Sequence, residues 1–150
     1  MMYWTDDQIK LYKEALEFND TVSLDASGKF IKIIELYSDG KTAYLFLYVI
    51  VIHFNDKIYP VGQMLSEIHN TIHITQWRTY WLEAFSKPKQ MVVDGSLALL
   101  NSLCLSIFNL YYTGYLDKYF DFFMNKIVNI PEVIIRRDRN HLFKNVRYWK

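Results

Sequence analysis

The sequence predicts a mixed α/β domain in which three antiparallel strands are followed by helices that alternate with two parallel strands. After an initial helix, the first half of the chain holds apolar runs separated by Asp-Gly and Asn-Asp turn signals, which is typical of a meander. From about residue 71 the apolar residues recur at helical spacing instead. Because parallel strands need crossover helices, this order indicates a five-stranded mixed sheet flanked by helices.

Length and composition indicate one packed domain over 1–150. The chain has 150 residues, of which 51% are hydrophobic and 17% aromatic, so it can build a real core. The longest apolar run, 43–52, has ten residues, whereas about twenty are needed for a membrane-spanning helix. We therefore expect no membrane segment. The single cysteine, Cys104, suits a reducing intracellular compartment, and its apolar helical surroundings favour a buried thiol over a nucleophile.

The first predicted element is a helix that begins after Thr5. Thr5 and Gln8 have the spacing of a capping box, in which each side chain accepts a hydrogen bond from the other residue's backbone N–H. Apolar residues then recur on one face as far as Leu16, and the helix is expected to end near Asn19.

Three strands of the meander follow this helix. They are predicted at 21–25 with an extended continuation over 30–37, at 43–52, and at 58–64. Tight turns are expected at 38–41 and 55–57. Because the strand at 43–52 is apolar on both faces, we expect it to be central and covered on both sides.

The second half of the chain is predicted to alternate helices and strands. Its elements are expected at 71–85 (helix), 91–93 (strand), 96–108 (helix, capped by Ser96), 114–127 (helix), 133–135 (strand) and from Arg139 onward (helix). A three-stranded meander followed by this alternation is the element order of an RNase H-like fold. In that fold the first and fourth strands are neighbours, which here means 21–25 and 91–93.

Asp25 and Asp94 are the most informative polar residues. Each lies in or directly after an apolar strand, and small residues follow both. A buried carboxylate is unfavourable unless it is neutralised, and two close carboxylates repel each other. Mg²⁺ prefers oxygen ligands, so a divalent metal site is one interpretation. In the alternative, Asp94 caps the following helix and Asp25 lies in a turn.

Positive charge is concentrated in the last part of the chain. Residues 136–150 carry a net charge of +5, whereas residues 1–135 carry −4. The basic side chains near this end are Arg136, Arg137, Arg139, Lys144 and Arg147. Such a segment can meet DNA phosphates, although a solvated chain end explains it equally well.

Four short motifs occur in order along the chain. They are Asp25-Ala26-Ser27-Gly28; Pro60-Val61-Gly62-Gln63-Met64-Leu65-Ser66-Glu67; Pro88 to Ser96 with the continuation Ala98-Leu99-Leu100-Asn101; and Asp138-Arg139-Asn140-His141. Together they resemble motifs of Mutator-like DDE transposases and related insect element-derived proteins, which have an RNase H-like fold. The resemblance spans nearly the whole chain.

The resemblance implies metal-dependent cleavage and strand transfer of DNA at transposon ends, in the nucleus. It implies that Asp25 and Asp94 are catalytic ligands of a two-metal Mg²⁺ or Mn²⁺ site, braced by Asp138 and His141. The basic side chains from Arg136 to Arg147 would then contact DNA, and a homo-oligomer or flanking domains would complete the assembly.

The chain departs from the family pattern in its third acid, a glutamate on a later helix. The chain ends nine residues after His141, and the late Glu132 precedes the fifth strand. We therefore expect a catalytic core truncated before its third acid and incomplete as an enzyme. The alternatives are a domesticated, non-catalytic remnant that binds DNA or protein, and a different metal nuclease of the same fold with its last acid inside the chain.

Other candidate groups have simpler interpretations. His69 and His73 have a metal-ligand spacing, but a helix start at Asn70 separates them. Asp138 and His141 could instead form a structural hydrogen-bonded pair. The aromatic residues of 111–123 favour a core or an interface over a base-stacking platform.

Overall fold

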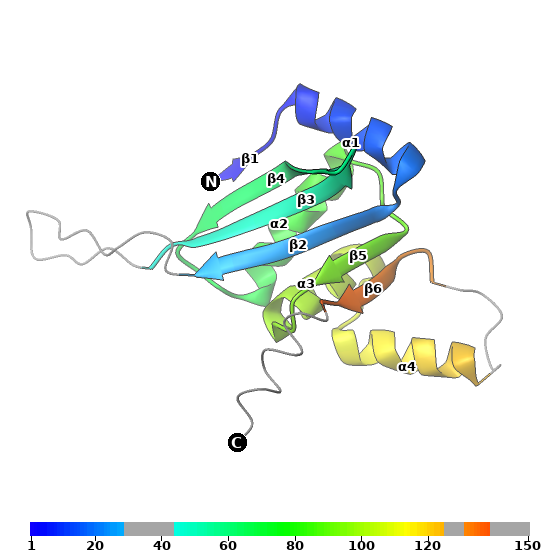
Figure 1. Cartoon of the computed structure of the whole chain (residues 1–150). Coiled ribbons are helices and arrows are strands. Elements are labelled where there is room, and N and C mark those ends of the chain that lie inside the picture. Colours follow the sequence, from blue (N-terminus) through cyan, green and yellow to red (C-terminus); the bar gives the residue numbers. More distant parts are fainter. Residues whose placement is uncertain (29–43, 125–130, 139–150) are drawn as a thin grey trace, which may run out of the picture.

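The computed structural model describes residues 1–28, 44–124 and 131–138, and in these ranges it has six strands and four helices (Figure 1). The strands are β1 (Met2–Tyr3), β2 (Thr21–Gly28), β3 (Phe46–Phe54), β4 (Lys57–Ser66), β5 (Gln90–Val93) and β6 (Ile134–Arg137). The helices are α1 (Asp6–Phe18), α2 (Thr71–Ala84), α3 (Leu97–Phe108) and α4 (Tyr112–Phe123). The predicted mixed α/β class is confirmed.

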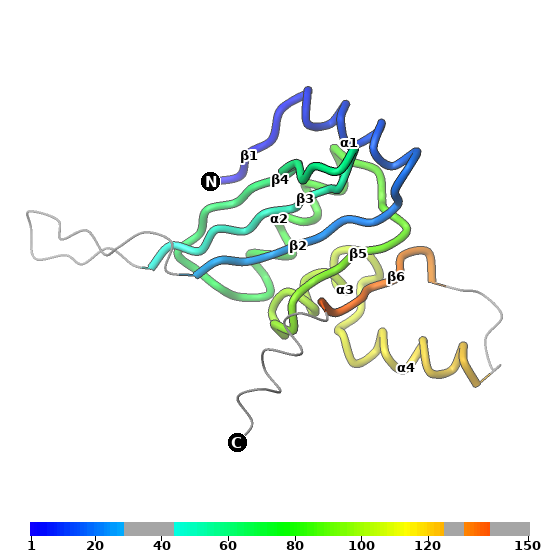
Figure 2. Tube along the Cα trace, viewed as in Figure 1, coloured from blue at the N-terminus to red at the C-terminus, as the bar shows by residue number. Residues whose placement is uncertain are grey.

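The strands form one sheet with the order β1-β4-β3-β2-β5-β6. β2, β3 and β4 are the antiparallel meander, while β5 and β6 run parallel to β2, as the traces of Figure 2 show. The predicted neighbour relation between the first and fourth strands of the expected sheet is therefore confirmed. The predicted number of strands is wrong, because β1 adds a sixth strand beside β4.

The predicted turn between β3 and β4 is confirmed, and the backbone angles of its two residues explain why these residue types form it. Asn55 and Asp56 form this turn, with positive φ angles of 49° and 59°. Asparagine and aspartate tolerate this left-handed conformation, and such two-residue turns match the twist of the paired strands. The other predicted turn, at 38–41, and the extended segment 30–37 lie outside the described residues.

Helix α1 has the predicted capping box: the Thr5 side chain accepts from the Gln8 N–H, and Gln8 accepts from the Thr5 N–H at 2.7 Å. It ends at the cap residue Asn19, as predicted. Helix α4 begins at Tyr112, two residues before its predicted start at 114. It ends at Phe123 with Met124 as its cap residue, so the predicted continuation is wrong at Met124. Residues 125–127 and the predicted helix from Arg139 lie outside the described residues.

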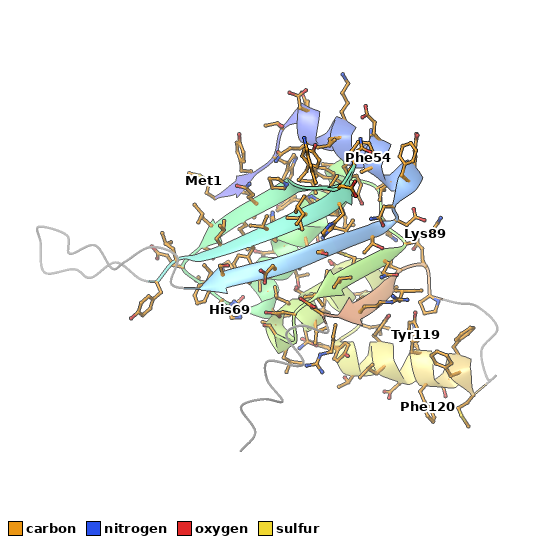
Figure 3. The ribbon with its side chains drawn as sticks, viewed as in Figure 1. Met1, Phe54, His69, Lys89, Tyr119 and Phe120 are labelled. Carbon is orange, nitrogen blue, oxygen red and sulfur yellow. The ribbon has the colours of Figure 1, made fainter. Side chains whose placement is uncertain are left out.

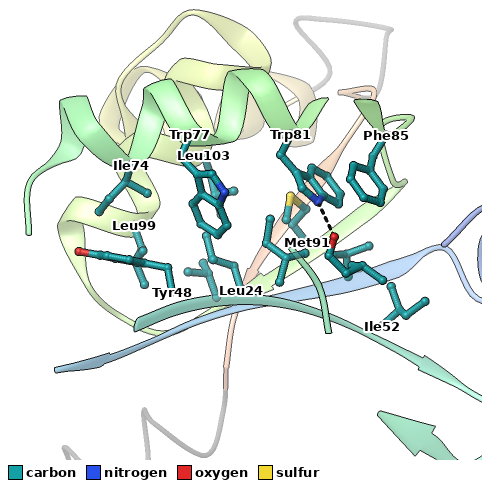
Figure 4. Close-up of a cluster of buried hydrophobic side chains, with 14 of the residues drawn as sticks. Leu24, Tyr48, Ile52, Ile74, Trp77, Trp81, Phe85, Met91, Leu99 and Leu103 are labelled. Atoms are coloured by element: carbon teal, nitrogen blue, oxygen red, sulfur yellow. Dashed lines mark hydrogen bonds between the residues drawn. The ribbon is translucent and has the colours of Figure 1, made fainter. Parts of the chain in front are cut away.

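The core lies on the sheet face that α2 and α3 cover (Figure 4). The indole of Trp81 packs there, and its Nε1 donates to the Val61 carbonyl at 3.2 Å. Tyr12 of α1 packs edge-on against the same indole, with ring centroids 5.2 Å apart. The helices α1 and α2 and the central strands are thereby joined in one aromatic core.

The opposite face of the sheet is less covered. On β3, Tyr48, Ile50 and Ile52 are buried, but Leu47, Val49 and Val51 between them are only half-buried. The prediction that this strand is covered on both sides is wrong for the described residues. The reason is that the described helices α2 and α3 pack on one face of it, so its alternate side chains are left beside solvent.

An arginine, Arg78, is fully buried in the core between α2 and β5. Its Nη2 donates to the Met91 sulfur at 2.9 Å, and its guanidinium lies 4.9 Å from the Trp81 ring centre. Its Nε and Nη1 atoms have no hydrogen-bond partner among the described residues. Burial lowers the pKa of Arg78 to about 9.

Cys104 is buried in α3, as predicted, and burial raises the pKa of its thiol to about 12. Within the described part of the chain, no single helix has the length and apolar character to cross a membrane. Helices α3 and α4 reach that length and composition only together, and they are bent by 66° at the break between them.

Candidate active site

Three aspartates follow one another in a single row across the parallel strands. Leu24 of β2 pairs with Val93 of β5, and Val93 pairs with Arg137 of β6. The residues that directly follow these three are Asp25, which is inside β2, and Asp94 and Asp138, which come just after β5 and β6. The Asp138 N–H donates to the Val93 carbonyl at 2.7 Å, so the ladder between β5 and β6 continues to this row. We call these three residues the aspartate row.

The aspartate row lies on the face of the sheet away from α2 and α3. Side chains alternate between the two faces of a strand. Leu24 and Val93 are buried on the helix-covered face, so Asp25 and Asp94 point the other way. All three aspartates line one pocket of about 210 Å³, together with Ser23, Val51 and Val92 and parts of Leu24 and Val93. The two predicted site residues, Asp25 and Asp94, are thus brought together on one face.

Asp25 differs from its predicted environment. It lies inside β2, where it pairs with Val49, and its side chain is exposed. Its Oδ1 accepts from the Ala26 N–H at 2.8 Å. The expectation that this carboxylate is desolvated in an apolar strand is wrong, because its face of the sheet is not covered by the described helices. The alternative interpretation, that Asp25 lies in a turn, is wrong as well.

Asp94 is half-buried at the entrance to α3. Its Oδ1 accepts from the Ser96 N–H at 2.7 Å, which closes a short turn before the helix. Ser96 occupies the N-cap position, but its own side chain makes no capping hydrogen bond. The Asp94 side chain, rather than that of Ser96, therefore stabilises the start of α3, and this bond fixes the orientation of the carboxylate beside the pocket.

Among the described residues, no group of three or more His, Cys, Asp or Glu side chains is arranged to hold a metal ion. Two of the carboxylates are turned to nearby backbone N–H groups, at Ala26 and Ser96. The backbone positions are nevertheless adjacent, since neighbouring strands lie about 4.8 Å apart. The donor set consists of carboxylate oxygens, which is the chemistry that suits Mg²⁺ or Mn²⁺.

The two basic residues of β6 lie on opposite faces. Arg136 pairs with Val92, which lines the pocket, so Arg136 shares the face of the aspartate row and is exposed. Arg137 is on the other face, and its guanidinium lies over Gly95, where an added Cβ would be 2.5 Å from Nη2. The other predicted DNA contacts, Arg139, Lys144 and Arg147, and the predicted supporting residue His141 lie outside the described residues.

Other polar candidates are not part of this pocket. Glu132 forms an ion pair with Lys87 at 2.9 Å before β6 begins. His69 Nδ1 is 2.7 Å from the Tyr48 hydroxyl, and His73 is hydrogen-bonded to Asn70 at the start of α2. The two histidines therefore have separate partners. Their spacing of four residues reflects the start of helix α2, which lies between them.

Sequence reasoning predicted a supporting role for Asp138 but not its place in the row. The predicted strand ended at Ile135, whereas β6 continues to Arg137. An apolar strand followed directly by aspartate is the pattern that singled out Asp25 and Asp94. Asp138 directly follows the longer strand, but Arg136 and Arg137 stand before it in place of apolar residues, so this pattern could not have found it.

Helix α4 presents aromatic residues in two directions. The Tyr115 side chain is buried, and its hydroxyl accepts from the Ile135 N–H of β6 at 2.9 Å. Phe120 is 61% exposed and points away from the sheet (Figure 3). The predicted core role therefore holds for the inner side of α4, while its outer side is exposed.

No family model matches this chain, and no solved structure matches it. The chain is similar to a protein encoded by a transposable element. That relative is the 120.7 kDa protein in the NOF-FB transposable element of Drosophila melanogaster, with 35% identity over 147 residues. The match covers 97% of this chain and 14% of the relative. The likeness supports a transposon-related origin for the chain.

Proposed function

We propose that this chain forms part of the catalytic core of a DDE-type transposase with an RNase H-like fold. The observation that carries the proposal is that Asp25 and Asp94 occupy adjacent positions on neighbouring parallel strands and line one pocket. The strand order β4-β3-β2-β5-β6 and the similarity to a transposable-element protein support it. Asp25 and Asp94 would hold Mg²⁺ or Mn²⁺ through their carboxylate oxygens.

Ions held by Asp25 and Asp94 would supply the charge that activates an attacking water or 3′-hydroxyl and stabilises the leaving oxygen of a phosphodiester. The protein contributes position and charge. Asp25 is exposed, so a DNA backbone can reach it. Asp94 is oriented by the Ser96 N–H. Arg136 on the same face supplies a positive charge for phosphates beside the carboxylates.

The substrate in this proposal is the DNA at the ends of the element, and the compartment is the nucleus. The chain spans 14% of the length of the relative that it matches. Recognition of the DNA ends is therefore assigned to other parts of a longer protein or to a second copy of the chain. The chain itself contributes the carboxylate face at which the strands are cut and joined.

Metal-dependent cleavage of a duplex that carries the element's terminal repeat tests this proposal. With Mn²⁺, the wild-type chain within its complete transposase is expected to nick this duplex, and Asp25→Asn and Asp94→Asn should each abolish the nicking. Asp117→Asn is the matched control, because Asp117 is exposed on α4, away from the pocket. DNA binding without cleavage by the wild type would overturn the proposal and favour the non-catalytic remnant.

A further inference from the structure

We infer that the outer side of α4 is the surface through which two copies of this chain form a reversible dimer. Four large apolar side chains carry the inference, and we call them the α4 stripe: Leu116, Phe120, Phe123 and the cap residue Met124. None of the four lines the pocket of the aspartate row. The inference is therefore independent of the proposed metal chemistry, and each can fail without the other.

The α4 stripe is a continuous apolar surface along one side of the helix. Leu116, Phe120 and Met124 are spaced four residues apart, and Phe123 stands three residues after Phe120, so the helical repeat brings all four to one face. Their side chains are between 45% and 71% exposed. Phe120 points away from the sheet in Figure 3. Contiguous exposed apolar side chains of this kind are typical of a docking surface.

Contacts on the inner side of α4 hold this surface in place. The buried Tyr115 accepts a hydrogen bond from the Ile135 N–H of β6 at 2.9 Å. Its ring stacks on Phe108 of α3, with ring centroids 5.3 Å apart. Because α4 is anchored to both β6 and α3, the stripe is a preformed surface. A partner that docks on it therefore does not have to order the helix first.

The exposed area of the α4 stripe suits pairing with a second copy. Four side chains of about 200 Å² each, exposed by roughly 60% on average, present about 500 Å² on each copy. Two copies that bury their stripes against each other would remove about 1,000 Å² from water, which is near the lower limit for a specific interface. This area predicts a reversible dimer with a dissociation constant in the micromolar range.

The order of residues in the stripe makes it complementary to itself. Phe120 is central, and Leu116 and Met124 lie four residues before and after it. When two such helices cross in opposite directions about a two-fold axis at Phe120, Leu116 of each copy faces toward Met124 of the other, as a symmetric interface requires. Residues four apart form the ridges that interlock in the commonest class of helix pair. The stripe contains no charged side chain, so its burial leaves no charge without solvent.

Sedimentation equilibrium of the purified chain over a wide concentration range tests the inference. The wild type is expected to change from monomer to dimer at micromolar concentrations. Phe120→Glu should raise the dissociation constant at least about tenfold, because it places two like charges at the centre of the interface. Tyr80→Glu is the matched control, since Tyr80 is an aromatic residue of α2 that is 54% exposed and lies outside the stripe. This control should dimerise like the wild type.

Disulfide linking tests the two-fold arrangement. Phe120→Cys should link two copies under mild oxidation, because the two cysteines then lie beside the axis. Leu116→Cys alone should link poorly, since its two positions lie about 12 Å apart along the helices, beyond the reach of a disulfide. The wild type gives the background, because Cys104 is buried.

A wild type that stays monomeric at every concentration would overturn the inference and leave the α4 stripe to another part of a longer protein. A dimer that persists in Phe120→Glu would overturn it as well. Phe120→Ala covers the case in which Phe120→Glu fails to fold, because alanine suits a helix and removes only the central ring. This variant should keep the circular dichroism of the wild type and still dimerise more weakly. Linking through Leu116→Cys but not through Phe120→Cys would contradict the two-fold axis at Phe120.

Discussion

The indole of Trp81 lies directly over Gly62, so that a Cβ atom on this glycine would come within 2.7 Å of the indole Cδ1 and Nε1 atoms. Trp81 is fully buried and is held in place by its hydrogen bond to the Val61 carbonyl. Gly62 is therefore needed for the close approach of α2 to β4, which supports the sheet from the face opposite to the aspartate row.

Gly62→Ala is expected to destabilise the protein by about 1–3 kcal/mol, because a buried indole must shift to accept the methyl group. Urea unfolding followed by tryptophan fluorescence measures this change. Gly95→Ala is the matched control: its Cβ would meet the Arg137 guanidinium, the end of a flexible and exposed side chain. Equal destabilisation by the two substitutions would contradict this account of the core.

Arg78→Met is expected to stabilise the protein. The Arg78 guanidinium is fully buried with no acidic partner in hydrogen-bonding contact among the described residues. Replacing a buried charge by an apolar side chain of similar volume is often neutral or stabilising by about 1–4 kcal/mol. Urea unfolding at pH 7 measures the difference, and Lys118→Met on the exposed face of α4 is the control. Destabilisation by Arg78→Met would show that the guanidinium is a favourable part of the core.

The stability gained in Arg78→Met should depend on pH. Burial lowers the pKa of Arg78 in the folded protein from 12.5 to about 9. The charged form is disfavoured in the fold, so the penalty is complete below about pH 9 and is relieved as the pH rises from there toward the ordinary pKa. The stability difference between variant and wild type should therefore be constant from pH 6 to 8 and smaller at pH 10. A difference that grows with pH would contradict this assignment.

Cys104 is expected to resist thiol reagents in the native protein. Its thiol is buried, and burial raises its pKa to about 12, so the reactive thiolate is scarce at pH 8. Labelling with a disulfide reagent should be slow under native conditions and fast in denaturant. Rapid labelling of the folded protein would show that α3 opens or that the thiol is accessible.

Local patterns predicted the parts of the fold that depend on neighbouring residues. The capping box of Thr5 and Gln8 and the Asn55-Asp56 turn are both set by interactions within a few residues, and both are confirmed. Strand β1 was missed because Met2 and Tyr3 are too few to show any periodicity. Its conformation is created by pairing with Gln63 and Met64 of β4, far along the chain.

The candidate site was partly predictable, because two of its residues have a local sequence pattern. Asp25 and Asp94 each follow an apolar strand, and this local pattern is visible in the sequence. Asp138 was recognised only through its motif, because the two arginines before it hid the continuation of β6. The exposure of Asp25 was not predictable. The neighbouring strand β3 is apolar on both faces, and its sequence alone does not show that one of these faces is only half-buried.

A crystal structure of the chain grown with Mn²⁺, with the metal located by its anomalous scattering, tests the central claim most directly. The account predicts an Mn²⁺ ion in the pocket of the aspartate row, with oxygen atoms of both Asp25 and Asp94 among its ligands. An empty pocket at saturating Mn²⁺, with Asp25 and Asp94 still bonded to the Ala26 and Ser96 N–H groups, would contradict it.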